Sequence, residues 1–587
     1  MNENDLLEKE ILAKALQDHK KNNYKSAEKL YKEVLKKNPN NINAIIPLGA
    51  LLGQSKKLEE AKKLFQKAIS INPNNSKVHY NLGLVFKEKN EYLKAISCYE
   101  EAIKIDPNYS KPHNNLGVIF YELHEFKKSR DCYEKAIQIN PNFSQAHFNL
   151  GNLYEELFEY EKALSCYEQA IKINPISANY YFNLGNLYED LGRYAKAIES
   201  YKKAIEFKPD YIDAYNNLAL VLKQIGKIQE AISLYEKIIK LKFDNLISIY
   251  YLSQLKKEIL DKNLEKKIIK IIKQDNCTKE NYTYGNFLLS KYEFAKRNYK
   301  NEFNHLAKGH LNYLKLKGIS LSNEIDYWLN KLPNMKELFD LKKIEENSDN
   351  NFFKINPIFI IGIPRSGSTL IEKIIASGRK QIPIGEETNI FRNFVKQLVN
   401  NNSLTKLDIK VARTQIIEKY KSKGLIEKEN DNMFTDKSLD NFFYIGLVKK
   451  IFPNAKFIHC QRHSLSSIMS IFKNIYKDIP WGHNLEHIFQ YIDNYKKIVK
   501  NFYGDFIYDL QYEVFVKNPE LQSKKLLEFC NIPWDIKCLE FYKRKDIISK
   551  TASAFQIKKA IYQDSGEKYL QYKDFLYKYK KKYTWFN

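Results

Sequence analysis

The chain has 587 residues, a formal net charge of +25 and 44% hydrophobic residues. This length exceeds what one hydrophobic core ordinarily holds, so we expect at least two domains. The apolar content excludes a wholly disordered chain. The positive charge favours anionic partners, but most of it is lysine spread over predicted helical faces, and no segment matches a nucleic-acid-binding motif.

The sequence also predicts where the protein works. The first ten residues, MNENDLLEKE, are polar and acidic, unlike a secretory signal. Apolar runs such as IFIIGI are too short to span a bilayer. The seven cysteines form no CxxC pair, which argues against a zinc site or a disulfide framework. We therefore expect a cytoplasmic protein with no membrane span and no metal.

A 34-residue period runs through the first part of the chain. It is visible in a column of prolines, a column of glycines and a column of aromatic residues: Pro39, Pro73, Pro107, Pro141, Pro175 and Pro209; Gly49, Gly83, Gly117, Gly151 and Gly185; Tyr31, Phe65, Tyr99, Tyr133, Tyr167, Tyr201 and Tyr235. Each unit is predicted to form two helices. In residues 76–109, Ala95, Tyr99 and Ala102 share one helical face, and Pro107 ends the second helix.

These columns resemble the tetratricopeptide repeat family, with about seven units and a predicted domain over residues 1–245. The resemblance implies a right-handed superhelix with a concave groove. A column of asparagines at the position that lines this groove in the family is formed by Asn81, Asn115, Asn149, Asn183 and Asn217. Their amides could hold the backbone of a peptide or protein acceptor. The alternative is that Asn is only a consensus residue there.

Residues 246–350 are predicted to be degenerate helical repeats and a linker, since the helical pattern continues out of register and ends in the polar stretch EENSDNN. Residues 351–587 begin with a different pattern. The run PIFIIGI suits a buried parallel strand, PRSGS a turn, and TLIEKIIASG a helix. A strand that leads through such a turn into a helix directs backbone N–H groups at an anion.

This loop is not an ATP-binding Walker A motif, because Ser368 stands where that motif requires lysine. A nucleotide kinase is therefore disfavoured. Arg365 is the cation of the turn instead.

The PRSGST stretch resembles the 5′-phosphosulfate loop of sulfotransferases that use 3′-phosphoadenosine-5′-phosphosulfate (PAPS), and further motifs in the expected order extend the resemblance to bacterial fusions of tetratricopeptide repeats with a sulfotransferase domain. The resemblance implies an α/β, P-loop-like domain with a parallel sheet. It assigns the 5′-phosphosulfate to the loop and helix start, which are Arg365, Ser366, Gly367, Ser368 and Thr369. It assigns the 3′-phosphate to Arg462 and to Ser470, eight residues later. It assigns a further cofactor contact to Tyr512.

Two more residues carry the catalytic part of the resemblance. The second Glu of GEET, Glu387, matches the general base of tyrosylprotein sulfotransferases, and Lys437 matches the lysine that contacts the transferring group. Arg365 and Lys437 would stabilise charge on the sulfuryl group and the leaving phosphate, as in phosphoryl transfer. Glu386 and Glu387 could instead be an ordinary acidic pair at a helix start.

The chain departs from the family pattern in two places. The segment that usually reads Ser-x-Gly-Arg-Trp is SGEKY here, so Lys568 takes the place of the cofactor-binding Arg, and Ser565 is a doubtful substitute for an assisting serine. Asn474 stands where tyrosylprotein sulfotransferases carry a second 3′-phosphate arginine.

The sequence therefore predicts a PAPS-dependent enzyme that transfers the sulfuryl group to an acceptor hydroxyl. The favoured acceptor is a tyrosine of a protein that the repeats recruit. Carbohydrate or small-molecule acceptors are one alternative. A non-catalytic repeat scaffold with a degenerate sulfotransferase domain, favoured only by SGEKY, is the other.

Overall fold

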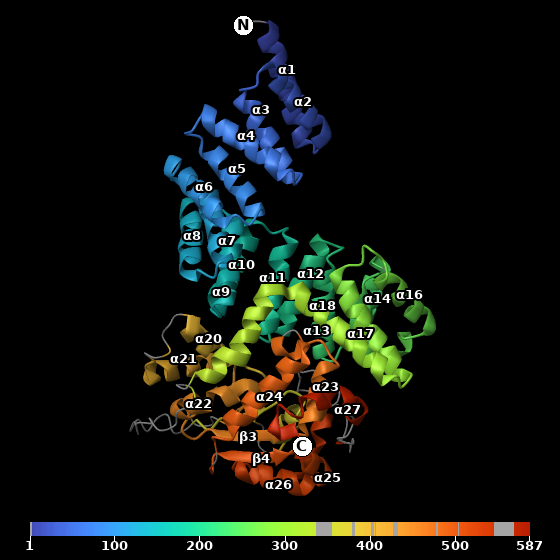
Figure 1. Cartoon of the computed structure of the whole chain (residues 1–587). Coiled ribbons are helices and arrows are strands. Elements are labelled where there is room, and N and C mark those ends of the chain that lie inside the picture. Colours follow the sequence, from blue (N-terminus) through green and yellow to red (C-terminus); the bar gives the residue numbers. More distant parts are fainter. Residues whose placement is uncertain are drawn as a thin grey trace. The chain divides into compact units, whose positions relative to one another are not determined.

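The fold is taken from a computed structural model of the chain (Figure 1). It describes residues 3–242, 244–335, 338, 355–378, 382–400, 404, 407–426, 433–476, 479–502, 504–544, 561 and 569–586. The chain packs as two compact units, residues 1–190 with 203–209, and residues 191–202 with 210–587. The domain limits inferred from the sequence stay a prediction.

The first unit consists of consecutive helix pairs in the 34-residue register. Its helices are α1 (Glu3–Lys20), α2 (Tyr24–Lys37), α3 (Ile42–Gln54), α4 (Leu58–Ile71), α5 (Ser76–Glu88), α6 (Tyr92–Ile105), α7 (Ser110–Glu122), α8 (Phe126–Ile139), α9 (Ser144–Glu156), α10 (Tyr160–Ile173) and α11 (Ala178–Asp190), while α12 (Tyr194–Phe207) is divided between the units.

The recurring small and aromatic residues explain why the helices pair. Tyr99 of α6 is fully buried, and a Cβ on Gly83 of α5 would lie 2.5 Å from its ring. Glycine is therefore required where the two helices approach. The turn between them has a left-handed residue, Asn90, with φ of 58°. The helical repeat prediction is confirmed, and the same close approach recurs between Gly49 and Phe65, Gly117 and Tyr133, and Gly151 and Tyr167.

The groove asparagines are less available than the sequence suggests. Within the first unit, Asn115 donates to the Tyr80 hydroxyl at 3.2 Å, Asn149 to Asn114 at 2.9 Å and Asn183 to Asn152 at 3.0 Å. Each amide thus bridges neighbouring repeats, which gives these three residues a structural role within the array.

The second unit begins with repeat-like helices and continues into an α/β region. The helices of its first part are α13 (Ile212–Gln224), α14 (Ile228–Leu241), α15 (Leu246–Leu255), α16 (Lys262–Ile272), α17 (Lys279–Ala295) and α18 (Tyr299–Asp326). The α/β region contains β1 (Ile358–Gly362), α19 (Ser368–Ala376), α20 (Ile390–Asn400), α21 (Ile409–Ser422), β2 (Thr435–Asp436), α22 (Ile445–Ile451), β3 (Lys456–Gln461), α23 (Ser464–Phe472), α24 (Leu485–Val499), β4 (Ile507–Gln511), α25 (Tyr512–Lys517), α26 (Pro519–Phe529) and α27 (Lys573–Leu576).

The four strands form one parallel sheet in the order β2-β1-β3-β4. Ile358 of β1 pairs with Thr435 on one side and Lys456 on the other, and Phe457 of β3 pairs with Ile507 of β4. The predicted parallel sheet is confirmed. Because all strands run the same way, their carboxyl ends lie at one edge of the sheet.

Both faces of the sheet are covered, as the continuous apolar sequence of β1 requires. On one face Ile360 and Ile458 share a core with Ile371 of α19 and Leu526 of α26. On the other, Phe359 and Phe457 belong to a larger core that includes residues of α20, α22 and α24. Figure 1 shows α24 and α26 on opposite sides of β3 and β4.

The repeat-like helices of the second unit pack directly on the α/β region. His310 of α18 contacts the Phe472 carbonyl oxygen through Nε2 at 2.7 Å and His483 through Nδ1 at 3.0 Å. The Tyr572 hydroxyl donates to Glu302 at 2.5 Å. These helices therefore support α23, which ends at Phe472. Among the described residues, none of the helices has the length and apolar content needed to cross a membrane.

Candidate active site

The loop between β1 and α19 has a left-handed backbone at two positions. Arg365 and Gly367 have φ of 71° and 91°, and Gly367 immediately precedes α19. A Cβ on Gly367 would lie 2.2 Å from the Tyr512 ring, so this position requires glycine. Such a turn at a helix N-terminus is suited to binding an anion.

Arg365, Ser470, Arg462 and Tyr512 meet beside this loop, although they lie far apart in the sequence. Arg365 Nε donates to Ser470 Oγ at 2.9 Å, and Arg462 Nη1 donates to the Arg365 carbonyl oxygen at 3.1 Å. The Arg462 guanidinium lies 5.0 Å from the centre of the Tyr512 ring. These contacts leave Arg462 Nε buried with no hydrogen-bond partner among the residues described.

The other residues of the loop are nearly enclosed. Ser366 is fully buried and its hydroxyl has no partner within the described part of the chain, while Ser368 and Thr369 are also buried at the start of α19. A buried hydroxyl without a partner is costly, so a bound ligand that accepts a hydrogen bond from it would stabilise the loop. Lys568 lies outside the described residues.

Glu387 and Lys437 form an ion pair at the other end of the same sheet edge. Lys437 Nζ lies 3.1 Å from Glu387 Oε1, and the Lys437 side chain is fully buried whereas that of Glu387 is 45% exposed. Burial acts to lower the pKa of Lys437, but the carboxylates of Glu387, Glu372 and Glu386 outweigh it and raise the pKa. Lys437 therefore stays a buried cation beside a solvent-accessible carboxylate.

The strand-like contact between GEET and β2 positions this pair. Ile384 bridges to Thr435, and the Gly385 N–H donates to the Thr435 carbonyl oxygen at 2.9 Å. A Cβ on Gly385 would lie 2.2 Å from that oxygen. The close approach explains the glycine of the motif.

Glu386 faces inward, away from this role. It is buried and lies 3.5 Å from Lys373 Nζ, and its N–H donates to Glu372 Oε1 at 3.0 Å. Burial raises the pKa of Glu372 to about 7, and Lys437 acts against this. The sequence analysis missed that Glu372 and Lys373 are both buried. The two charged residues within the otherwise apolar helix TLIEKIIASG could have indicated this.

Tyr476 is a second residue that the sequence analysis missed. Its hydroxyl is buried without a hydrogen-bond partner in the described structure. Burial raises the pKa of Tyr476, with Arg365 acting against the rise and Glu387 adding to it. The phenol therefore lies within electrostatic range of both parts of the site.

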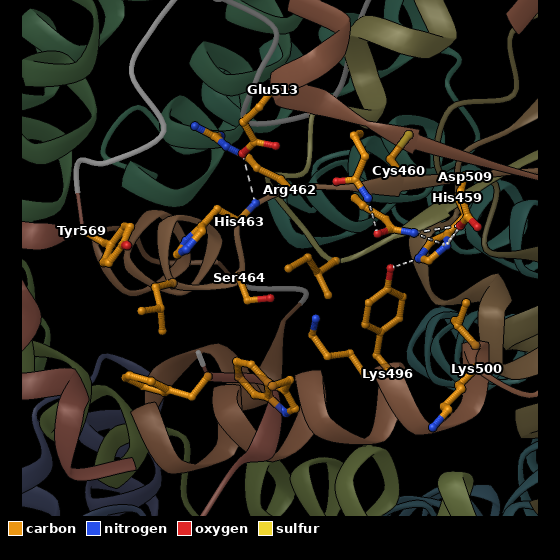
Figure 2. Close-up of a pocket in the computed structure, with 18 of the residues that line it drawn as sticks. His459, Cys460, Arg462, His463, Ser464, Lys496, Lys500, Asp509, Glu513 and Tyr569 are labelled. Atoms are coloured by element: carbon orange, nitrogen blue, oxygen red, sulfur yellow. Dashed lines mark hydrogen bonds and ion pairs between the residues drawn. The ribbon is translucent and has the colours of Figure 1, made fainter. Parts of the chain in front are cut away.

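A pocket of about 1220 Å³ adjoins Arg462 at the carboxyl ends of β3 and β4 (Figure 2). Lys496 of α24 and Lys500, just after this helix, line one wall. His463 donates its N–H to Glu513 at 3.0 Å, and its ring stacks on Tyr569 at 4.5 Å. Tyr569, the last residue of SGEKY, thus lies beside the Arg462 element.

His459 of β3 is also hydrogen-bonded on both ring nitrogens. Its Nδ1 lies 2.6 Å from Asp509 Oδ1, and its Nε2 contacts the Tyr495 hydroxyl. These contacts tie His459 into the base of the pocket, away from Glu387. In the described structure no group of three or more His, Cys, Asp or Glu residues could hold a metal ion.

Residues 357–536 match a family model described as the sulfotransferase family. They form a sulfotransferase domain. Tetratricopeptide repeat models match residues 18–84, 83–124, 110–143, 144–176, 166–199, 185–226 and 212–245. The chain thus carries tetratricopeptide repeats ahead of a sulfotransferase domain, as the sequence analysis predicted.

Three curated relatives share parts of this arrangement. An uncharacterized protein of Aquifex aeolicus is 29% identical over 263 residues, 41% of this chain and 34% of that protein. Protein-tyrosine sulfotransferase 1 of Danio rerio is 26% identical over 30% of this chain and 54% of its own length. Protein-tyrosine sulfotransferase A of Caenorhabditis elegans is 25% identical over 36% and 59%. The chain therefore spans between a third and three fifths of these relatives.

Solved structures match parts of the repeat region. The crystal structure of MamA is 25% identical with a TM-score of 0.25, over 27% of this chain and 94% of MamA. YrrB, described as a TPR protein with an unusual peptide-binding site, is 24% identical with a TM-score of 0.26, over 31% and 95%. At these TM-scores neither structure bears on the site of the sulfotransferase domain.

Proposed function

We propose that the chain transfers a sulfuryl group from PAPS to an acceptor hydroxyl. One observation carries the proposal. The strand order β2-β1-β3-β4 aligns Lys437, the anion-binding loop, Arg462 and Tyr512 along one edge, because each follows the carboxyl end of a different parallel strand. Ligands of open parallel sheets bind at this edge.

The groups along the edge fit the two charged ends of the donor. The loop N–H groups, Arg365 and the unpartnered Ser366 hydroxyl suit the 5′-phosphosulfate. Arg462, whose Nε has no partner in the described part of the chain, suits the 3′-phosphate together with Ser470. Arginine beside a hydroxyl is a strong phosphate-binding combination.

The transfer step needs positioning and charge stabilisation more than covalent chemistry. The bond from sulfur to the bridging oxygen of the 5′-phosphate breaks as the acceptor oxygen bonds to sulfur. Glu387 takes the acceptor proton, and Lys437 with Arg365 stabilises the negative charge on the sulfuryl oxygens and the leaving phosphate. The products are a sulfate ester and adenosine 3′,5′-bisphosphate.

A protein tyrosine is the acceptor that we propose first. The partly exposed carboxylate of Glu387 is accessible to a bulky acceptor, and two curated relatives are named protein-tyrosine sulfotransferases. Repeats ahead of the domain offer a surface that recruits a polypeptide. The cytoplasmic location and the domain limits 1–245, 246–350 and 351–587 remain part of this proposal.

Donor binding and acceptor choice test the proposal separately. Calorimetry with adenosine 3′,5′-bisphosphate should show binding to the wild type and at least tenfold weaker binding to Arg462→Gln, since hydrogen bonds to charged groups contribute about 1.5–3 kcal/mol. Arg130→Gln, which alters a partly exposed arginine of the repeats, serves as the control.

Acceptor choice is then read from the transfer of labelled sulfate from PAPS to a panel of tyrosine peptides and saccharides. We expect labelled peptides. Saccharide labelling alone would overturn the tyrosine acceptor, and absence of donor binding would leave the repeat scaffold as the better description.

A further inference from the structure

Asp436 is a buried carboxylate to which the proposed mechanism gives no part. It is the last residue of β2 and the one before Lys437, and its side chain is fully buried. A buried carboxylate is costly unless hydrogen bonds or a cation compensate its charge. The groups that do so at Asp436 therefore show what this residue holds in place.

Each carboxylate oxygen of Asp436 accepts two hydrogen bonds. Oδ1 accepts from the Ser438 N–H at 2.9 Å and from Asn441 Nδ2 at 3.2 Å, both within the segment that follows β2. Oδ2 accepts from the Thr388 hydroxyl at 2.5 Å and from the Tyr420 hydroxyl at 2.6 Å. Hydrogen bonds to a charged acceptor are stronger than neutral ones. Asp436 thus joins its own segment to GEET and to α21.

The hydrogen bond between Thr388 and Asp436 lies next to the ion pair of the site. Thr388 is the residue after Glu387. Asp436 is the residue before Lys437, whose N–H donates to the Glu386 carbonyl oxygen at 2.6 Å. The two segments are therefore joined on either side of Glu387, and this arrangement sets the 3.1 Å contact between Lys437 Nζ and Glu387 Oε1.

The GEET backbone around Thr388 needs such an anchor. Glu386 and Asn389, on either side of Glu387 and Thr388, have φ of 51° and 54°. Residues other than glycine adopt this left-handed region at a cost, and they stay there only where surrounding contacts hold them. The Thr388 side chain is bound one residue after Glu387, so it limits how far this backbone can relax.

Other contacts keep the two segments together beyond this point. The Asn389 N–H donates to Ser438 Oγ at 2.9 Å. Arg392 of α20 donates to the two carboxylate oxygens of Asp440 at 2.8 and 2.9 Å. Loss of one hydrogen bond at Asp436 should therefore leave the segments paired and alter the geometry close to GEET.

We propose that Asp436 is a positioning residue, which acts through Thr388 to hold the Glu387 carboxylate at the acceptor hydroxyl. Tyr420 binds the same oxygen from α21, which carries none of the proposed site residues, so it stabilises the buried charge without contacting GEET. This inference rests on the proposed function, since it concerns the base of that reaction.

The test compares two variants that each remove one hydroxyl from Asp436 Oδ2. Thr388→Val and Tyr420→Phe keep the shape of the side chain, and each leaves the carboxylate with three hydrogen bonds. With PAPS and the acceptor that the wild type labels best, we expect Thr388→Val to lower kcat by about tenfold or more, since a displaced base reacts poorly, with the KM for the acceptor unchanged. Tyr420→Phe should keep the kcat of the wild type, although it loses stability to a similar degree. Thr388→Ser, which restores the hydroxyl, should restore kcat.

A second measurement separates the failure of this inference from the failure of the proposed function. Crystal structures of the variants, which need no activity, should keep the contact between Lys437 and Glu387 in Tyr420→Phe and lose it in Thr388→Val. Chemical denaturation and binding of adenosine 3′,5′-bisphosphate show that both variants are folded. Absence of transfer by the wild type would overturn the proposed function, and the crystal contacts then still decide whether Thr388 positions Glu387. An equal fall of kcat in both variants, or a wild-type kcat in Thr388→Val with the contact kept, would overturn the inference.

Discussion

Adjacent residues of one motif have different surroundings. Glu386 has φ of 51°, which turns the chain so that its side chain is buried near Lys373 while Glu387 meets Lys437 at the accessible edge. The sequence resemblance points to the second glutamate as the base, and this assignment stays a prediction.

Exchanging each glutamate for glutamine should therefore affect different properties: catalysis for Glu387 and stability for Glu386. Glu387→Gln should lower kcat by about 10²–10⁴, the usual contribution of a general base, with donor binding retained. Glu386→Gln should lower the free energy of unfolding by about 3 kcal/mol, because it leaves the buried Lys373 without that carboxylate. Rates of sulfate transfer and chemical denaturation measure the two effects. Full activity of Glu387→Gln would remove it as the base.

At the scale of elements, the loop between β1 and α19 depends on the strand two places along the sheet. Gly367 approaches the Tyr512 ring at the end of β4 so closely that no side chain fits. Tyr512 in turn lies under Arg462. The loop, Arg462 and Tyr512 are therefore one packed arrangement.

Gly367→Ala should disturb this arrangement as a whole. The left-handed backbone and the overlap with Tyr512 each cost about 1–3 kcal/mol, and displacement of Tyr512 moves Arg462. We expect a lower melting temperature and at least tenfold weaker binding of adenosine 3′,5′-bisphosphate. Gly378→Ala is the matched control, since a Cβ there meets nothing within 4 Å. Equal binding of adenosine 3′,5′-bisphosphate by both variants would show that the loop does not contribute to the donor site.

Local sequence patterns made the repeats and the loop predictable, whereas contacts between distant segments could not be predicted from them. The 34-residue period and the strand–turn–helix pattern identify the repeats and the loop because both are set by neighbours in the sequence. The bridging role of Asn115 depends on Tyr80 of the adjacent repeat. The surroundings of the buried charges Glu372 and Lys373 and of the buried Tyr476 hydroxyl depend on segments far along the chain, which periodicity does not bring together.

At the scale of the whole molecule, the sulfotransferase domain and the repeat-like helices before it share a core. Trp328 packs against Phe443 at 6.0 Å, and Phe303 stacks on Phe575 at 4.0 Å. Buried side chains from α15 to α18 and from the α/β region form one apolar cluster. The predicted boundary at residue 350 therefore marks a change of architecture, while the packing continues across it.

This continuity predicts that residues 351–587 alone will not form a stable domain. Removing the residues before 351 would expose the surface under Trp328 and Phe303. Each large apolar side chain contributes about 1.5–3 kcal/mol on burial, so the loss of several such contacts is comparable to the 5–15 kcal/mol that stabilise a typical fold. The truncation would also remove His310, which contacts the end of α23 at Phe472. A fragment of residues 191–587 retains this packing and should melt cooperatively and bind adenosine 3′,5′-bisphosphate, whereas 351–587 should aggregate or show neither property. Thermal melting and calorimetry on both fragments measure the difference. If 351–587 melts at the same temperature as the longer fragment and binds the bisphosphate equally well, the helices before it are not needed for the fold of the active site.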